Sequence, residues 1–440
     1  MHISEVSIIA AVAHKITEQS NVRSKFKRAL RDVNVQELVD SDNRHSIIAV
    51  LNEEVTGEHL NYVLHALTKD ARHVGIVVAG LGNIGQRFLE LLPEQLTQVS
   101  VLENVHLVGL VASKKALINT DGIDTRHAMS LFHEQAKDYD NEQLLSWLIN
   151  HPYDELVVID ITPSEDFSLL YQQFFEQGIH VIGANKWAAS SSNDNYLALK
   201  QASNINHALW LGNTTVGAGL PVNYAINDLL RSGDKIAEIS GIFSGTLSWL
   251  FNNYDGSQSF SSLTLQALEE GLTEPDPRDD LSGKDVQRKL LILARMAGFS
   301  LSLDDIECQN LVPEELQKIS KNEFLTRINE VDDYFSEQLA LANDKNKCIR
   351  YIARFDASNG ELKAKVSLEH LEPSDAFANL APCDNIFQIT SCWYKDNPLI
   401  IRGPGAGRDV TACGLHSDLV KVCIQLMNKQ NLVKIKGINS

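Results

Sequence analysis

Residues 273–290, TEPDPRDDLSGKDVQRKL, crowd acidic and basic side chains directly in front of an apolar stretch. Carboxylates beside a lysine suit a site that holds an ammonium group and also delivers a proton. An exposed loop would not normally run into four consecutive apolar residues, so we expect this segment to lie against the body of the protein. The candidate residues for this chemistry are Glu274, Asp276, Asp279, Asp280, Asp285 and Lys289.

The same segment predicts the elements that would carry these groups. Pro275 and Pro277 favour an extended loop. Residues 282–285, SGKD, have the form of a capping box, which predicts that a helix begins near residue 283. Asp285 and Lys289 then lie four residues apart on one helix face. The alternative is a capped helix with one surface ion pair, worth at most about 1 kcal/mol, but capping leaves the earlier carboxylates unexplained.

The sequence GLGNIG at residues 80–85 follows an apolar run and precedes a predicted helix. In such a G-x-G-x-x-G turn the first glycine permits the tight turn, the second lets the backbone approach a pyrophosphate, and the third lets the helix pack on the strand. The alternative is a glycine-rich turn without a ligand. We predict a dinucleotide site that includes Gly80, Gly82, Asn83, Ile84 and Gly85.

The end of the next strand bears on the type of dinucleotide. Val111 is followed by Ala112, Ser113, Lys114 and Lys115, where an acidic residue would bind the ribose 2′-hydroxyl. A hydroxyl and two ammonium groups suit a 2′-phosphate instead. The sequence therefore favours NADP over NAD, although two lysines at a solvated strand end are also common.

Two later strands end in polar residues that would share one edge of a parallel sheet. Lys186 follows the strand 180–183, at the position where doubly wound sheets place ligands. It could bind a carboxylate or polarise a carbonyl, although a lysine after a strand is more often only exposed. Thr162 follows the strand 156–161, and we place it beside the nicotinamide.

Three glycine-containing segments are weaker signals, because ordinary turns can look the same. VGAGLP at 216–221 is a turn into a helix, SGTLS at 244–248 follows a strand, and GPGAG at 403–407 is a loop before a helix. Backbone N–H groups in such turns can meet a cofactor or substrate anion. From these segments we assign Thr246 to the substrate site and Gly405 to the cofactor site.

The elements around these residues predict an α/β protein. From residue 74 strands alternate with helices, which predicts a Rossmann-type doubly wound parallel sheet. The first seventy residues read as a β-α-β-β-α unit, and residues beyond 215 as an α+β domain. The predicted segments are a small α+β domain at 1–70, a dinucleotide-binding domain at 71–215, a substrate-binding and dimerisation domain at 216–395, and a segment returning to the dinucleotide-binding domain at 396–440.

Composition excludes several classes of function. The 440 residues carry a formal net charge of −18 without a local basic patch, so neither nucleic acid nor an anionic membrane is an expected partner. The N-terminus has no basic region or cleavage site, and no run is long enough to span a bilayer. Six scattered cysteines fit reduced thiols. We expect a cytoplasmic enzyme whose partner is a small-molecule substrate.

The segments TTVGAGLPV, GIFSGTLSWLF, VIGANKWA, RGPGAGRDVTA and TEPDPRDDLSGKDVQRKL, arranged around GLGNIG, resemble the homoserine dehydrogenases. The likeness runs from about residue 72 to 427 and is strongest to the dehydrogenase half of bifunctional aspartokinase/homoserine dehydrogenases of the methionine-associated type. The TEPDPRDDLSG segment is the most specific part. The first seventy residues resemble an incomplete ACT domain, the amino-acid-sensing module of such enzymes, and no kinase segment is found.

The resemblance implies an activity and roles for the matching residues. The reaction would be the reversible NADP(H)- or NAD(H)-dependent interconversion of L-homoserine and L-aspartate 4-semialdehyde, in threonine and methionine biosynthesis. Glu274 and Asp280 would hold the amino end of the substrate. Lys186 and Lys289 would lie at or near the reacting oxygen, and Asp285 would orient Lys289, which is therefore our first choice as proton donor.

The resemblance also implies a monovalent-cation site and a regulatory unit. Backbone carbonyls of Val216, Ala218 and Leu220 would bind sodium together with the side chain of Asn213, where many members have an acidic residue. A neutral amide attracts a cation less, so cation dependence stays open. With an incomplete ACT-like unit, threonine feedback stays open as well, and the unit could serve only as a packing or oligomer surface.

Two other functions compete with this one. A catalytically silent NADP-binding sensor would bind cofactor without turnover, but the retention of costly buried charges argues against it. Another amino-acid dehydrogenase of the same fold would differ in its substrate. The predicted strands near 350–370 and 385–402 could form an open sheet that pairs across a homodimer or higher homo-oligomer.

Overall fold

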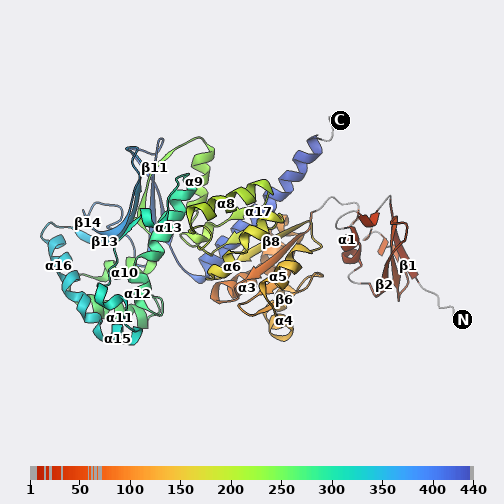
Figure 1. Cartoon of the computed structure of the whole chain (residues 1–440), viewed down its shortest axis with the longest axis horizontal. Coiled ribbons are helices and arrows are strands. Elements are labelled where there is room, and N and C mark those ends of the chain that lie inside the picture. The colour runs from red at the N-terminus through yellow and green to blue at the C-terminus, as the bar shows by residue number, and fades with distance from the viewer. Residues whose placement is uncertain are drawn as a thin grey trace.

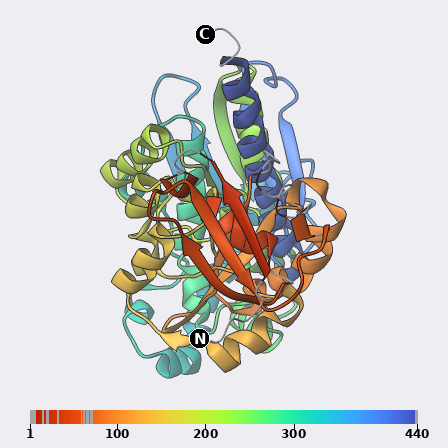
Figure 2. The same cartoon turned by 90° about the vertical axis from the view of Figure 1, so that its right-hand side faces the viewer.

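The computed structural model describes residues 7–13, 16–18, 22–30, 33–57, 59–60, 63, 67 and 72–436. Three β-sheets organise these residues, and they follow one another along the chain with three, seven and six strands. In Figure 1 the small sheet lies at one end, the seven-stranded sheet in the middle, and the six-stranded sheet at the other end. Figure 2 looks along this axis, with the small sheet in front.

The small N-terminal unit is an antiparallel sheet in the order β1-β3-β2, with α1 packed against it. Alternation in β3 buries Ile47, Ala49 and Leu51 against Phe26 and Leu30 at the helix. The predicted strands and first helix are confirmed. From the sequence we also expect Asn21 to cap the first helix, and Leu60, Val63, Leu64 and Leu67 to lie on a second helix. Asn21 and Leu64 lie outside the described residues. The bounds are β1 Ser7–Val12, α1 Val22–Ala29, β2 Val35–Asp40 and β3 Ser46–Leu51.

The central sheet is doubly wound, as predicted, with strand order β10-β9-β8-β4-β5-β6-β7. Helices α3 and α17 pack on one face, and α5, α7 and α8 on the other. Its strands are β4 Val74–Ala79, β5 Val105–Val111, β6 Lys115–Ile118, β7 Lys137–Asp138, β8 Glu155–Asp160, β9 His180–Gly183 and β10 Trp210–Leu211. Its helices are α3 Asn83–Gln98, α4 Ala128–Gln135, α5 Asn141–Ile149, α6 Glu165–Ser168, α7 Tyr171–Glu176, α8 Asn193–Ile205 and α17 Arg408–Lys436.

Sequence patterns missed several features of this sheet. After β5 the chain turns straight back, with the Ala112 N–H donating to the Lys115 carbonyl at 2.8 Å, so β6 pairs antiparallel in a stretch where the sequence predicted no element before a helix around 141–150. Helix α8 was not predicted, because polar residues dilute its apolar face. Helix α3 continues through Pro93 to Gln98, although proline normally ends a helix.

The six-stranded sheet has the order β12-β14-β13-β11-β15-β16, with antiparallel pairing everywhere except β12-β14. Its strands are β11 Ile236–Ile242, β12 Glu307–Cys308, β13 Cys348–Asp356, β14 Lys363–Leu371, β15 Asp384–Ser391 and β16 Leu399–Pro404. Its helices are α9 Val222–Arg231, α10 Gly245–Asn253, α11 Phe260–Glu269, α12 Pro277–Leu281, α13 Lys284–Met296, α14 Glu314–Gln317, α15 Lys321–Arg327 and α16 Asp332–Asn343.

After the strand that ends near Phe243 the sequence predicts one long helical tract up to Ala297, but the structure has four helices there, α10 to α13. Ser244, Ser259 and Asp276 each accept a hydrogen bond from a backbone N–H at the start of α10, α11 and α12, and so restart the helix. Gly283, with φ of +71°, then turns the chain into α13. The segment 273–290 therefore consists of a short loop, the helix α12 and the first part of α13.

Among the described residues, no helix is both long and apolar enough to cross a membrane.

Candidate active site

A cavity of about 1020 Å³ lies where the carboxyl ends of the central strands face the six-stranded domain. It gathers segments that are far apart in the sequence. The start of α3 and the end of β9 contribute from the central domain, and the turn before α9 joins the two domains. The remaining walls are the start of α10, residues of the segment 271–289, residues 382–384 at the start of β15, and residues 404–407 together with Thr411 on α17.

Two lysines share one carboxylate in this cavity. Lys289 Nζ lies 2.8 Å from Asp285 Oδ2, one turn away on α13, and Lys186 Nζ lies 3.4 Å from Asp285 Oδ1. Lys289 also donates to the carbonyl of Phe243, at 2.7 Å. An ammonium group has three donors, so two are used to hold Lys289 and one is left for the cavity that it lines. Lys186 lacks this second anchor among the described contacts.

The charge of Asp285 is set by these neighbours. Burial would raise its pKa, but the positive charges of Lys289 and Lys186 hold the pKa of Asp285 far below its usual range. Its side chain is 49% exposed, toward the cavity, whereas that of Lys289 is only 11% exposed. The carboxylate is therefore ionised throughout the working pH range and serves the site more than the stability of the fold.

Two further predicted residues lie beside this triad. Asp280 accepts a hydrogen bond from the backbone N–H of Glu274, 2.8 Å away, and Thr246 donates to the Leu272 carbonyl at 2.6 Å. Burial raises the pKa of Asp280 to about 6, and the nearby carboxylates of Glu274 and Asp285 add to the rise. A positive charge placed beside Asp280 would relieve this repulsion.

Of the remaining acidic residues of the segment, one lines the cavity and the other stabilises the local fold. Asp279 lines the cavity. Asp276 does not: it caps α12 and pairs with Arg278 at 2.6 Å. Arg278 in turn donates to the Leu316 and Ile319 carbonyls, at 3.1 and 2.7 Å. Our grouping of Asp276 with the site carboxylates was therefore wrong, because its role is to join α12 to the α14 region.

The expected capping box was also wrong in detail. The helix does begin at Lys284, but Gly283 holds the cap position and provides no side-chain cap. The Ser282 hydroxyl accepts from the Lys284 N–H at 3.3 Å and donates to the Asp279 carbonyl at 2.9 Å. Asp285 is thus free of a capping role and available to the lysines. The extended loop expected at Pro277 is likewise the first turn of α12.

A buried polar network fixes the position of Lys186. Asp160 is fully buried and accepts hydrogen bonds from Tyr171 at 2.8 Å and from the Asn185 side chain at 3.0 Å. Asn185 also donates to the Ser164 carbonyl, 2.7 Å away, and more weakly to the Thr162 hydroxyl, 3.3 Å away. Asp160 and Asn185 are therefore positioning residues beneath the strand ends, and Thr162 lies in their network.

The glycine turn has the geometry that its sequence predicts. Gly80 has φ of +94°, and a Cβ there would lie 2.6 Å from the Ile161 backbone. A Cβ on Gly85 would lie 1.9 Å from the Gly80 carbonyl oxygen, whereas one on Gly82 would have open space around it. Neighbouring backbone thus leaves no room for a side chain at Gly80 or Gly85, whereas the space beside Gly82 is open. Ile84 lines the active-site cavity, and Asn83 begins α3.

Ser113, Lys114 and Lys115 are exposed at the turn after β5. The Gly80 N–H donates to the Val111 carbonyl at 2.8 Å, which joins this turn to the glycine turn. The three side chains are not among the residues that line the large cavity. They lie at the same sheet edge as the glycine turn.

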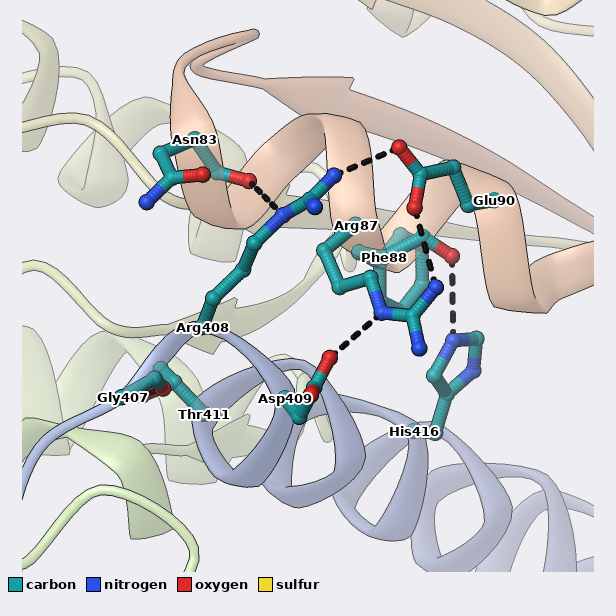
Figure 3. A network of polar contacts seen from close by, with 9 residues as sticks. All are labelled: Asn83, Arg87, Phe88, Glu90, Gly407, Arg408, Asp409, Thr411 and His416. Atoms are coloured by element: carbon teal, nitrogen blue, oxygen red, sulfur yellow. Dashed lines mark hydrogen bonds and ion pairs between the residues drawn. The ribbon is translucent and has the colours of Figure 1, made fainter.

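The C-terminal helix ties the loop 403–407 to the start of α3 (Figure 3). Arg408 donates to the Asn83 carbonyl, 3.2 Å away, and to Glu90 at 2.5 Å. Arg87 donates to Asp409 at 2.6 Å. Deeper along the helix, His416 lies 3.1 Å from the Phe88 carbonyl. These contacts hold Gly405 and Gly407 beside the glycine turn.

Asn385 was missed by sequence reasoning. It is fully buried on β15, and a Cβ added to Gly405 would lie 1.9 Å from its Cγ. Asn385 therefore fixes how closely the loop approaches the strand, and it explains why Gly405 must be glycine. Cys383, just before β15, and Asp384, its first residue, also line the cavity. A loop without glycine or motif gave no signal for them.

The turn that leads into α9 carries the predicted cation ligands. Ala218 adopts φ of +53°, and Gly217 one of +77°. Asn213 is 1% exposed, and neither polar atom of its amide has a hydrogen-bond partner among the described residues. The side chain of this buried amide therefore has an oxygen available for a ligand.

A pyrophosphate-type glycine turn at the edge of a doubly wound sheet, opening into a cavity with two lysines and several carboxylates, is typical of dehydrogenases that use a nicotinamide dinucleotide. Models of two families match this chain, one described as homoserine dehydrogenase over residues 221–420 and one as the homoserine dehydrogenase NAD-binding domain over residues 80–211. The chain belongs to the homoserine dehydrogenase family.

Individual relatives agree with this assignment. The chain is 42% identical to bifunctional aspartokinase/homoserine dehydrogenase 2 of Escherichia coli, over 94% of this chain and 51% of that protein. It is 36% identical to the chloroplastic bifunctional enzyme 1 of Arabidopsis thaliana, over 96% of this chain and 47% of that protein. The chain thus spans about half the length of the curated relatives it matches.

Solved structures show the same fold. A Candida auris protein of unknown function is 32% identical, with a TM-score of 0.73, and the match covers 80% of this chain and 98% of that one. A structure described as a homoserine dehydrogenase of Archaeoglobus fulgidus is 22% identical with a TM-score of 0.63, over 79% of this chain and 99% of that one.

Proposed function

We propose that this chain catalyses the reversible NAD(P)-dependent interconversion of L-homoserine and L-aspartate 4-semialdehyde. The observation that carries the proposal is the Lys289–Asp285–Lys186 triad, which lies in one cavity with Asp280 and with Ile84 of the glycine turn. The cavity therefore offers an ammonium group to a reacting oxygen and a carboxylate to an amino group, which is what an amino-acid aldehyde needs.

Lys289 is the proposed proton donor. A bound NADPH supplies the hydride that reduces the aldehyde carbon. The Lys289 ammonium stabilises the negative charge that develops on the aldehyde oxygen and transfers a proton to it, so that C=O becomes CH–OH. In the reverse direction the lysine takes the proton back. Asp285 and the Phe243 carbonyl keep Nζ in place, while Lys186 assists from the other side of Asp285.

The amino end of the substrate is assigned to the acidic side of the cavity. Asp280 binds the substrate ammonium, with Glu274 beside it and Thr246 on the adjoining helix start. The dinucleotide is assigned to Gly80, Gly82, Asn83, Ile84, Gly85, Thr162 and Gly405. NADP is preferred over NAD, because the exposed Ser113, Lys114 and Lys115 can bind a 2′-phosphate and no carboxylate stands among them.

A monovalent cation is part of the same proposal. The donor set would be the Asn213 Oδ1 atom, which has no described hydrogen-bond partner, and the carbonyls of Val216, Ala218 and Leu220. These are neutral oxygens, which suit a singly charged hard cation such as sodium. The cation would brace the turn that leads from the cavity into α9.

We also propose the four segments 1–70, 71–215, 216–395 and 396–440 as domains, the first of them ACT-like. A cytoplasmic location and a homodimer built on the six-stranded sheet complete the proposal. Light scattering tests the last point, since a monomeric mass would contradict it.

A substrate panel tests the activity. NADP⁺ reduction is followed by nicotinamide absorbance with L-homoserine, L-serine, L-threonine and 4-hydroxybutanoate. We expect turnover with L-homoserine, and a much lower kcat/KM for 4-hydroxybutanoate, which lacks the amino group that Asp280 binds. Turnover of another amino alcohol in place of homoserine would assign a different dehydrogenase. NADPH binding without turnover in either direction would leave the sensor function instead.

A further inference from the structure

The ion pair between Lys186 and Asp285 crosses the junction of the central and six-stranded domains, and a second contact crosses it nearby on the same helix. Arg288 lies on α13, three residues after Asp285, and its Cζ lies 3.9 Å from the centroid of the Trp187 ring. Arg288 also donates from Nη1 to the Ser190 hydroxyl, 2.9 Å away. Residues three apart share a helix face, so α13 presents Asp285 and Arg288 together to one turn of the central domain.

Ser190 connects Arg288 to the backbone of Lys186. Ser190 is only 2% exposed. Its hydroxyl donates to the Lys186 carbonyl at 2.8 Å, and its backbone N–H donates to the same carbonyl at 2.9 Å. A hydroxyl has one hydrogen to donate and lone pairs that accept, so it can hold Arg288 and the carbonyl at the same time. Two successive hydrogen bonds therefore join the guanidinium to the main chain of Lys186.

Trp187 offers the guanidinium a fixed surface. Its indole N–H donates to the Pro163 carbonyl at 3.1 Å, and its backbone N–H donates to the Asn185 side chain at 2.9 Å. A guanidinium is attracted by the face of a tryptophan ring and stacks on it. Arg288 thus contacts the residue directly after Lys186 as well as Ser190.

The charge of Arg288 is directed to this turn and not to the active-site cavity. Neither Arg288 nor Trp187 is among the described residues that line the cavity. Burial lowers the pKa of Arg288, and the carboxylates of Glu165 and Asp285 oppose this shift. An arginine stays protonated at any working pH. Arg288 is therefore a permanent cation whose contacts lie behind Lys186.

We propose that Arg288 is a positioning residue, which holds the turn of Lys186 against Asp285 across the domain junction. The proposal rests on the proposed function, because it assigns the effect of Arg288 on the reaction to the ammonium group of Lys186. Asp285 binds the side chain of Lys186 at 3.4 Å, while Arg288 fixes the backbone of the same residue. The Asn185 network already holds this turn from within the central domain. Arg288 adds the placement of the turn relative to α13.

A double-mutant cycle in the full chain tests the proposal. Values of kcat and KM for L-homoserine are measured in the native chain, in Arg288→Met, in Lys186→Met and in the double variant. Ser190→Ala removes only the connecting hydroxyl, and it serves as a second probe if Arg288→Met folds poorly. Arg327→Met is the matched control, because Arg327 is also half-buried and pairs with Glu330 far from this turn in the sequence.

Chemical labelling of Lys186 supplies a readout that needs no turnover. Each protein is treated with acetic anhydride, and the rate of acetylation at Lys186 is followed by mass spectrometry of its peptides. Lys137, an exposed lysine on β7, is the internal reference. A Lys186 side chain that leaves Asp285 becomes more accessible to the reagent.

The proposal expects Arg288→Met to lower kcat by about tenfold with a smaller change in KM. This loss should vanish when Lys186 is already methionine, because the two residues act through one ammonium group. Acetylation of Lys186 should become several-fold faster in Arg288→Met and also faster in Ser190→Ala. Acetylation of Lys137, and both readouts in Arg327→Met, should stay native.

A kcat loss that persists in the Lys186→Met background would show that Arg288 acts elsewhere and would overturn the proposal, as would a native kcat in Arg288→Met. An unchanged acetylation rate of Lys186 in both Arg288→Met and Ser190→Ala would overturn it whatever the activity. A native chain without turnover of L-homoserine would contradict the proposed function instead, and the acetylation rates would then decide the role of Arg288 by themselves.

Discussion

The pKa of Asp280 makes a quantitative prediction about substrate recognition. Burial beside Glu274 and Asp285 raises this pKa to about 6 in the free protein. Only the ionised carboxylate attracts the substrate ammonium. Binding of the substrate ammonium by Asp280 is therefore strong above the pKa of Asp280 and is lost as the pH falls through that pKa.

The magnitude follows from the titration curve. With a pKa of about 6, Asp280 is ionised in about one tenth of the molecules near pH 5 and in nearly all of them near pH 7.5. Because kcat/KM reports the ionisation of the free enzyme, the contribution of Asp280 should rise about tenfold across this range. Asp285 stays ionised throughout, since its pKa is far below normal.

The assay measures kcat/KM for L-homoserine across this pH range in the native chain and in Asp280→Asn. The ratio of the two removes the pH dependence of the proton transfer itself, which both proteins share. We expect that ratio to rise about tenfold from about pH 5 to about pH 7.5. A ratio that is constant with pH would show that Asp280 does not bind the substrate ammonium in its ionised form, and the reasoning would be refuted.

Three other changes have definite expected outcomes. Gly85→Ala places a Cβ 1.9 Å from the Gly80 carbonyl oxygen, so NADPH binding measured by fluorescence should weaken by at least about tenfold, and unchanged binding would contradict the packing role of this glycine. Gly405→Ala forces the loop away from Asn385 and should raise the cofactor KM while the melting temperature changes little. Arg278→Met leaves Asp276 and two carbonyls without their partner and should lower the free energy of unfolding by about 2–4 kcal/mol in a urea titration. Arg231→Met, an exposed arginine 3.9 Å from Asp228, is its control and should change stability by less than about 0.5 kcal/mol.

The sequence was informative where local chemistry leaves few choices. The glycine turn at 80–85 requires a positive φ at Gly80 and no side chain at Gly85. Only glycine meets both requirements easily, so the sequence alone predicts the turn. The pairing of Asp285 with Lys289 follows from helix spacing alone. That the two lie in one cavity with Lys186 depends on a contact across 99 residues of chain, which the family resemblance indicated and residue spacing could not.

Other features depend on tertiary contacts that no local pattern contains. Asp276 looks like its acidic neighbours in sequence. In the structure, however, Arg278 is held by the Leu316 and Ile319 carbonyls, and Asp276 pairs with Arg278 instead of lining the cavity. Asn385 gains its role only because the loop around Gly405 returns to β15. The hairpin at β6 depends on a single backbone turn after β5, in a stretch where the sequence predicted no strand.

The most direct test of the central claim is the rate of NADPH oxidation by L-aspartate 4-semialdehyde in the native chain and in Lys289→Ala. Lys284→Ala, on the exposed first turn of the same helix, is the control. Loss of a preorganised donor to the developing oxyanion should lower kcat by about 10²–10³-fold, with NADPH binding intact and the control near native. A native chain that binds NADPH but does not oxidise it, or a Lys289→Ala variant with native kcat, would contradict the account.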